Sequence, residues 1–316
     1  MIKNFIIILN PTAGKGYAEK SIPTIKTFME SHALNYRLII TEKPGHAITL
    51  AAESLSEPNT AVIAAGGDGT SNEVINGLMA YRDATGKSAM NTIPTFGVLP
   101  IGRGNDFAYG AGLPDTLEEN LALLTEPHIS PIDIGLIKGG DYPDGRFFVN
   151  GIGVGFDTKV GLEAGKMKHI HGALGYVLGA IKTLIIYPKA PVLKITYNNK
   201  TITEEPALVS IMNGKRMGGA FFMAPEGINH DGLLNICMTK QESRRKLLKA
   251  MIHYTKGTQA TRDDTITDTA ESYHLLAVEG DMAVHADGET ICIAGKELSI
   301  SCNKHALLFI CKKAAV

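Results

Sequence analysis

Three glycine-rich segments of the chain combine residue types that bind phosphate. They are Asn10-Pro11-Thr12-Ala13-Gly14-Lys15-Gly16, Gly66-Gly67-Asp68-Gly69-Thr70 and Pro100-Ile101-Gly102-Arg103-Gly104-Asn105-Asp106. Glycine lets a phosphate approach the main chain closely, and the N–H groups at the start of a helix attract an anion. Tight strand-to-helix turns also need glycine for purely steric reasons, so one such segment alone would be weak evidence.

Each glycine segment follows an apolar run that is typical of a strand buried on both faces. These runs are residues 5–9, 60–65 and 95–100, and a fourth run at residues 36–41 lies between them. Helical patterns at residues 22–32 and 45–55 complete a βαβαβ rhythm, which predicts an open α/β domain with a parallel sheet. All three segments then lie at carboxyl ends of strands, the side on which such sheets bind ligands.

Two familiar phosphate-binding schemes do not fit the first segment. It lacks the Gly-Lys-Ser/Thr ending of a P-loop, and its spacing differs from the dinucleotide fingerprint. After the second segment, Thr70-Ser71-Asn72-Glu73 has the spacing of a capping box just before Val74, Ile75 and Leu78. The sequence therefore predicts a helix that opens at Thr70.

From about residue 131 the pattern changes to short runs with period-two character. Residues 192–197, 207–212, 233–238 and 275–278 are predicted strands of an antiparallel domain, interrupted by helices near residues 172–187 and 242–254. We expect one domain at residues 1–130, completed by the tail 304–316, and a second at residues 131–303.

Composition is that of an ordinary globular chain with enough apolar residues for two cores. Of 316 residues, 44% are hydrophobic and 20% are charged. The four cysteines show no Cys-x-x-Cys spacing, which favours reduced core residues. The start of the chain lacks a signal-peptide cleavage site, and no apolar run reaches the ~20 residues of a membrane span. We therefore expect a cytoplasmic chain.

Charge is distributed unequally between the two halves. Residues 1–150 carry 11 Lys and Arg against 16 Asp and Glu, and residues 151–316 carry 20 against 16. The positive second half suggests an anionic partner such as a membrane surface or a nucleic acid, with chance surface charge as the alternative. Its predicted helix at 242–254 is basic and amphipathic and suits anionic headgroups, or else is a solvated face.

In order and spacing, the three glycine segments resemble the nucleotide-binding segments of the diacylglycerol kinase catalytic fold. Residues 225–233 resemble the structural magnesium loop of that family, and Asp287-Gly288-Glu289 resembles its catalytic segment. The resemblance covers nearly the whole chain. It implies the two-domain plan shared by NAD kinases and diacylglycerol kinases, with an open α/β nucleotide-binding domain and an antiparallel β-rich lipid-substrate domain.

The resemblance also implies roles for individual residues. Glu289 would be the general base, with Asp68 as a second catalytic residue, and Asp68, Asp106 and Asp133 would hold a catalytic Mg²⁺. The structural metal would be bound by the carboxylate of Asp231 and the carbonyls of Ile228 and Leu233. The nucleotide-binding positions would be Asn10, Pro11, Thr12, Ala13, Gly14, Thr41, Gly66, Gly67, Asp68, Gly69, Thr70, Ser71, Asn72, Arg103, Asn105 and Asp106.

The chain departs from the family pattern at two positions. Arg103 stands where the family commonly has a threonine that contacts nucleotide, although its planar fork of donors could clamp phosphate. His230 stands where an acidic or amide residue is common, beside the retained Asp231. Taken singly, each Asp beside Gly or Asn is also an ordinary turn former.

The function implied is an ATP- and Mg²⁺-dependent lipid kinase that phosphorylates diacylglycerol at the membrane surface. Phosphatidylglycerol, a sphingoid base or another long-chain alcohol is an alternative acceptor. An NAD kinase and a catalytically inactive lipid-binding protein are the rival functions. The implied partners are ATP and a lipid substrate, without nucleic acid, for a cytoplasmic and peripherally membrane-associated enzyme. A homodimer stays an open alternative.

Overall fold

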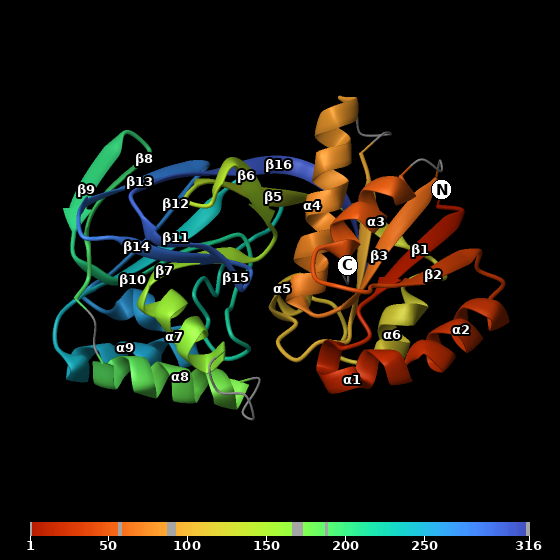
Figure 1. Cartoon of the computed structure of the whole chain (residues 1–316), viewed down its shortest axis with the longest axis horizontal. Coiled ribbons are helices and arrows are strands. Elements are labelled where there is room, and N and C mark those ends of the chain that lie inside the picture. The colour runs from red at the N-terminus through yellow and green to blue at the C-terminus, as the bar shows by residue number, and fades with distance from the viewer. Residues whose placement is uncertain (1, 56–58, 87–92, 166–172, 187–188, 314–316) are drawn as a thin grey trace. The chain divides into compact units, whose positions relative to one another are not determined.

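The computed structural model describes residues 2–55, 59–86, 93–165, 173–186 and 189–313. The chain divides into two compact units (Figure 1). Unit 1 comprises Met1–Ile134 with Lys304–Val316, and unit 2 comprises Gly135–Asn303.

Unit 1 is built on a parallel sheet with the strand order β2-β1-β3-β4. Leu308 and Phe309 of a long C-terminal strand pair in parallel with β4. All seven residues of β3 are buried, because helices cover both faces of the sheet. The predicted open α/β fold of the first half is confirmed. The strands are β1 (Asn4–Leu9), β2 (Tyr36–Ile40), β3 (Thr60–Gly66), β4 (Thr95–Pro100) and β16 (Glu297–Cys311).

Every second side chain of β1 points to the same face of the sheet, and helices cover that face. Phe5, Ile7 and Leu9 belong to one core cluster, into which the first two helices and the sixth insert apolar side chains. Figure 1 shows these helices together on one side of the strands. The unit 1 helices are α1 (Ala13–Lys20), α2 (Ile22–Ser31), α3 (His46–Ser54), α4 (Asp68–Thr85), α5 (Asp106–Gly110) and α6 (Leu117–Ala122).

Helix α4 starts three residues earlier than the predicted capping box requires. Its first residue is Asp68, its N-cap is the extended Gly67, and no side chain caps it. Glu73 instead accepts hydrogen bonds from the backbone N–H groups of Gly45 (2.8 Å) and Ala47 (3.1 Å), at the start of α3. The capping-box prediction is wrong, because Glu73 satisfies the free donors of a neighbouring helix.

Unit 2 contains two antiparallel sheets. One has the strand order β12-β11-β10-β7-β14-β15, and in the other β13 lies between β16 and β8, with β9 at the edge. One core cluster takes residues from both sheets, so the sheets pack face to face. The strands are β5 (His128–Gly139), β6 (Tyr142–Phe148), β7 (Gly151–Gly155), β8 (Val192–Tyr197), β9 (Lys200–Glu204), β10 (Pro206–Met212), β11 (Leu234–Lys240), β12 (Thr265–Ala270), β13 (Ser272–Glu279), β14 (Met282–Ala286) and β15 (Glu289–Gly295).

Three helices cover the outer face of the first of these sheets. Val209 and Ile211 of β10 point into the core between the sheets, whereas Leu208 and Met212 join a second cluster with the helices. Strand β10 is therefore buried on both faces. The helices are α7 (Phe156–Gly165), α8 (Ala173–Ile186) and α9 (Arg244–Lys256), with a short 3₁₀ helix at Gln259–Thr261 (Figure 1). The predicted β-rich second half is confirmed, and α7 is an element that the sequence pattern did not reveal.

Two smaller expectations can be compared with the structure. All four cysteines are free, and burial raises the pKa of the Cys237 thiol to about 11, which fits an inert core residue. In the described part of the chain, no helix combines the length and the apolar character that a membrane crossing requires. Residues 172 and 187, the ends of one predicted helix, lie outside the described residues.

Candidate active site

The strand order of unit 1 places the first two glycine segments on either side of a topological switch point. The chain passes from β1 to β2 on one side and then returns across β1 to reach β3. The segments after β1 and β3 therefore flank the point where the connections diverge, which is where open α/β sheets bind ligands. Thr41 follows β2 and donates its N–H to Leu9 O (2.9 Å), so it lies beside the first segment.

Backbone contacts between the three segments account for several of their glycines. A Cβ atom on Gly102 would lie 2.3 Å from the Cα of Gly67, and one on Gly14 would lie 2.5 Å from the carbonyl oxygen of Ile101. On Gly66 it would collide with Thr70. These positions therefore need glycine because a side chain would not fit. The lack of side chains also lets the main chains of the three loops approach one another.

Asn10 links the first segment to the second. Its Nδ2 donates to the Thr70 hydroxyl (3.4 Å), and its Oδ1 accepts from the N–H (3.1 Å) and the hydroxyl (2.8 Å) of Thr12. One amide side chain thus fixes the loop after β1 against the start of α4.

The third segment is held by Asn105 and Phe107. Asn105 adopts a left-handed conformation (φ 52°) and donates from Nδ2 to the carbonyls of Pro100 (3.0 Å) and Gly102 (3.2 Å). Phe107 is buried, with its ring centroid 6.0 Å from that of Phe96. Each such aromatic pair contributes about 0.5–1.5 kcal/mol beyond the burial of its area. This packing anchors a loop that has no regular structure of its own.

Asp68 and Asp106 converge on Gly104. Asp68 accepts a hydrogen bond at Oδ1 from the N–H of Phe107 (3.1 Å). A Cβ on Gly104 would lie 3.0 Å from the second oxygen of Asp68 and 3.7 Å from an oxygen of Asp106. The missing side chain of Gly104 therefore leaves room beside two carboxylates, and carboxylate oxygens suit a hard cation.

Asp133 is fixed at a different point of unit 1. It is fully buried, and its Oδ1 accepts from the N–H of His305 (2.7 Å). Nowhere in the described ranges do three or more His, Cys, Asp or Glu side chains come together as a metal-binding group. The structure thus brings Asp68 and Asp106 together, while a metal-binding role for Asp133 stays a prediction.

The remaining nucleotide-binding candidates differ in exposure. Thr70, Ser71 and Asn72 are buried in the first turns of α4, and the oxygens of Asn72 accept from the Asn76 amide. Their side chains therefore support the loop from behind. Arg103 is exposed, and none of the hydrogen bonds or ion pairs among described residues involves its guanidinium. It is free to meet an anion.

In unit 2, Asp287 holds the predicted catalytic segment in place. Its Oδ2 accepts from the N–H of Val149 (2.8 Å), and its Oδ1 accepts from Asn150 (3.0 Å) and Gly151 (2.9 Å). Asp287 itself has φ 47° and Gly288 has φ 87°, the positive values that suit an Asp-Gly hairpin turn, and the three bonds hold this turn in place. Two residues later, Glu289 is exposed at the start of β15 and pairs with no described side chain.

The predicted structural metal loop is exposed in unit 2. Asp231 accepts at Oδ1 from the N–H of Leu233 (2.9 Å), which closes a local turn. Ile228 is 46% exposed, and the ring of His230 lies 3.1 Å from the side-chain oxygen of Asn229. These residues are close in the loop, and their metal-binding role stays a prediction.

Sequence reasoning missed a buried acid and the hollow beside it. Asp157, at the start of α7, lies 3.0 Å from Nε2 of His285, and both side chains are largely buried. Among the described residues, Asp157 is the one charged residue on a hollow otherwise lined by apolar or aromatic side chains, most of them from α7, β10 and α9. The signal was the alternation Gly151-Ile152-Gly153-Val154-Gly155, because a Cβ on Gly153 would collide with both Asp157 and His285.

Two family models match the chain in succession. The diacylglycerol kinase catalytic domain matches residues 4–137. The YegS C-terminal NAD kinase beta sandwich-like domain matches residues 150–309. The first model covers the three glycine segments, and the second covers Asp157, Asp231 and Glu289.

Whole-chain relatives point in the same direction. A diacylglycerol kinase of Staphylococcus saprophyticus is 28% identical over 290 residues, covering 92% of this chain and 90% of its own length. A diacylglycerol kinase of Staphylococcus aureus is 27% identical over 290 residues, covering 92% of this chain and 87% of its own length. A crystal structure of a candidate diacylglycerol kinase from Bacillus anthracis superposes with a TM-score of 0.77 at 25% identity, covering 99% of each chain.

Proposed function

Because the chain belongs to the diacylglycerol kinase family, we propose that it transfers the γ-phosphoryl group of ATP to the hydroxyl group of a membrane lipid. The acceptor proposed is diacylglycerol and the product phosphatidic acid. The observation that carries this proposal is the meeting of three glycine loops at the switch point of the unit 1 sheet, with Asp68 among them.

The start of α4 fits the phosphates of a nucleotide. This helix has 18 residues, begins after Gly67 and has no side-chain cap, so its first N–H groups need a partner. Together with the helix dipole they favour an anion. We assign nucleotide contacts to the Asn10–Gly14 loop, Gly66–Gly69 and Arg103, whose exposed guanidinium can pair with phosphate oxygens.

Asp68 and Asp106 are the residues that fit a divalent cation. Oxygens of both carboxylates border the space that a side chain at Gly104 would fill, and carboxylate oxygens suit a hard cation. Mg²⁺ bound there would neutralise negative charge that develops on the transferring phosphoryl group. Asp231 with the carbonyls of Ile228 and Leu233 is proposed as a second, structural position.

Glu289 is proposed as the general base. Its exposed carboxylate accepts the proton of the lipid hydroxyl while that oxygen forms a bond to the γ-phosphorus. The bond between the γ-phosphorus and the β–γ bridging oxygen breaks, and ADP leaves with the electron pair. Asp287 positions this base by fixing the turn that precedes it.

The apolar hollow of unit 2 is proposed to take part of an acyl chain. It is lined by Phe156, Leu208, Met223 and Met251 among others, and Asp157 is the one acid among its described lining residues. Each buried CH₂ group of a chain contributes about 0.8 kcal/mol. Nearby, α9 exposes Leu248 and Ile252 beside Arg245 and Lys249, which suits peripheral binding to a membrane from the cytoplasm.

The test is transfer of labelled phosphate from ATP to diacylglycerol in mixed micelles and to NAD, assayed side by side. The NAD arm is needed because the matched second domain is described as NAD kinase-like. Labelled phosphatidic acid is the expected product, and transfer to NAD alone would exclude the proposal. Substituting phosphatidylglycerol and sphingoid bases in the same micelles identifies the acceptor. Absence of turnover with every acceptor would favour a lipid-binding protein without activity.

A further inference from the structure

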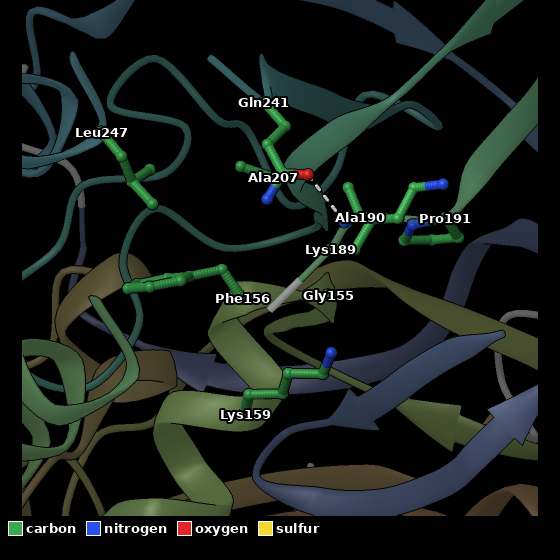
Figure 2. Close-up of a pocket in the computed structure, with 9 residues that line it drawn as sticks. All are labelled: Gly155, Phe156, Lys159, Lys189, Ala190, Pro191, Ala207, Gln241 and Leu247. Carbon is green, nitrogen blue, oxygen red and sulfur yellow. Dashed lines mark hydrogen bonds between the residues drawn. The ribbon is translucent and has the colours of Figure 1, made fainter. Parts of the chain in front are cut away.

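Unit 2 contains a second hollow that the proposed reaction does not use (Figure 2). It lies where β7 ends and α7 begins, between Gly155 and the segment that leads into β8. Phe156 and Leu247 line both this hollow and the apolar one, so they form the wall between the two. The other walls include Ala190, Pro191 and Ala207.

The lining of this hollow is positively charged. It includes Lys159 and Lys189, and none of the nine lining residues is acidic. Figure 2 shows Lys159 turning its ammonium group from α7 toward Gly155 and the segment of Lys189 and Ala190. On the opposite wall, the Gln241 side chain accepts a hydrogen bond from the N–H of Ala190 (2.7 Å).

Lys159 is partly withdrawn from water, and it pairs with no acid among the residues that the structure describes. Burial alone lowers the pKa of its ammonium group, with no acidic neighbour to oppose this effect. The nearest acids along α7 are engaged elsewhere: Glu163 pairs with Lys182 (2.6 Å), and Asp157 lies against His285. A half-buried cation of this kind lowers stability unless an anion joins it.

The hollow is separate from the predicted site of phosphoryl transfer. Gly151, at one end of β7, is tied to Asp287 of the catalytic segment, whereas Gly155, at the other end, borders the hollow. An extended strand rises about 3.3 Å per residue, so about 13 Å of chain separates the two places. An anion bound beside Lys159 is therefore not the group that reacts beside Glu289.

We propose that this hollow binds the phosphate-bearing headgroup of an anionic amphiphile, with Lys159 and Lys189 pairing with the phosphate. The apolar remainder of the lining contacts the part of the ligand next to the phosphate. Because Phe156 and Leu247 also border the acyl hollow, an occupant here stiffens the wall against which the acceptor lipid packs. This inference does not depend on the identity of the acceptor lipid or on catalytic turnover.

Binding is tested on the full chain without ATP by isothermal titration calorimetry. The first probe is a short-chain phosphatidic acid below its critical micelle concentration, and the second is inorganic phosphate alone. We expect the amphiphile to bind, and Lys159→Gln to weaken that binding about tenfold. Lys189→Gln, at an exposed lysine, should weaken it about two- to fivefold.

The matched control is Lys194→Gln, which removes the same charge from an exposed position on β8. It should leave the affinity unchanged within about twofold. Equal losses for Lys159→Gln and Lys194→Gln would overturn the proposal, and so would the absence of binding. Inorganic phosphate binding as tightly as the amphiphile would overturn the amphiphile as ligand. Thermal unfolding and ATP binding of each variant show that it is folded.

Discussion

The carboxylates of the proposed reaction are held differently in the two units. In unit 1, Asp68 lies among glycine loops whose main chains nearly touch, and Gly102 approaches Gly67 so closely that a Cβ atom would not fit. In unit 2, Glu289 projects from a turn that one carboxylate, Asp287, ties to three backbone N–H groups. The first site is shaped by the absence of side chains, and the second by a single side chain.

This difference predicts which substitutions damage binding, chemistry or stability. A site made of backbone tolerates no added atoms, so its glycines should matter for nucleotide affinity. In unit 2, positioning and reaction are proposed to belong to different residues: Asp287 holds the turn, and Glu289, two residues later, reacts. Asp287 should therefore matter for stability and Glu289 for chemistry.

The largest expected effect is on Glu289→Gln. The amide keeps the shape of the side chain but cannot accept the lipid proton, and general bases contribute about 100- to 10,000-fold. We expect kcat to fall by that factor, while ATP affinity and the free energy of unfolding stay unchanged because Glu289 is exposed and pairs with no described side chain. Steady-state kinetics with equilibrium ATP binding measures this. Near-normal turnover would refute the assignment of the base.

Asp287→Asn should mainly lower stability, whereas Glu289→Gln should mainly lower kcat. Asparagine offers one acceptor oxygen and an NH₂ group to the three N–H donors at Val149, Asn150 and Gly151, so at least one charge-assisted bond is lost. We expect the free energy of unfolding to fall by about 2–3 kcal/mol, measured by denaturant titration.

The control for this variant is Asp281→Asn, which lies in the same hairpin region but is half exposed and paired with Lys296 (2.9 Å). Exposed pairs contribute at most about 1 kcal/mol, so its effect should be smaller. If both variants lose the same stability, Asp287 does not hold the turn in the way that its hydrogen bonds indicate.

The same contrast explains how much of the molecule could be predicted from sequence. The strands of unit 1 and their glycine turns are local patterns, and the parallel fold follows from their order along the chain. The bonds of Asp287 join residues 136 to 138 positions apart, and the contact of Asp157 with His285 spans 128. No local pattern encodes such contacts.

The misplaced start of α4 has the same cause. Thr70-Ser71-Asn72-Glu73 has the spacing of a capping box, but Glu73 reaches the start of α3, 26 and 28 residues earlier in the chain. Thr70 is likewise engaged by Asn10, 60 residues away. Motif spacing identified the correct loop, and tertiary contacts decided what each of its side chains does.

Gly102→Ala should cost less stability than Asp287→Asn and should weaken nucleotide binding specifically. Its Cβ would lie 2.3 Å from the Cα of Gly67, so the two loops must move apart, at a cost of about 1–2 kcal/mol in unfolding free energy. Since both loops are proposed to contact the nucleotide, we expect ATP affinity to fall about tenfold while kcat at saturating ATP changes little.

The control is Gly161→Ala, at a helical position with open space around it. It should leave ATP affinity intact and raise stability by up to about 1 kcal/mol. Unchanged ATP affinity in Gly102→Ala would mean that the close approach of the loops serves packing alone, and the contrast between the two units would then rest on unit 2.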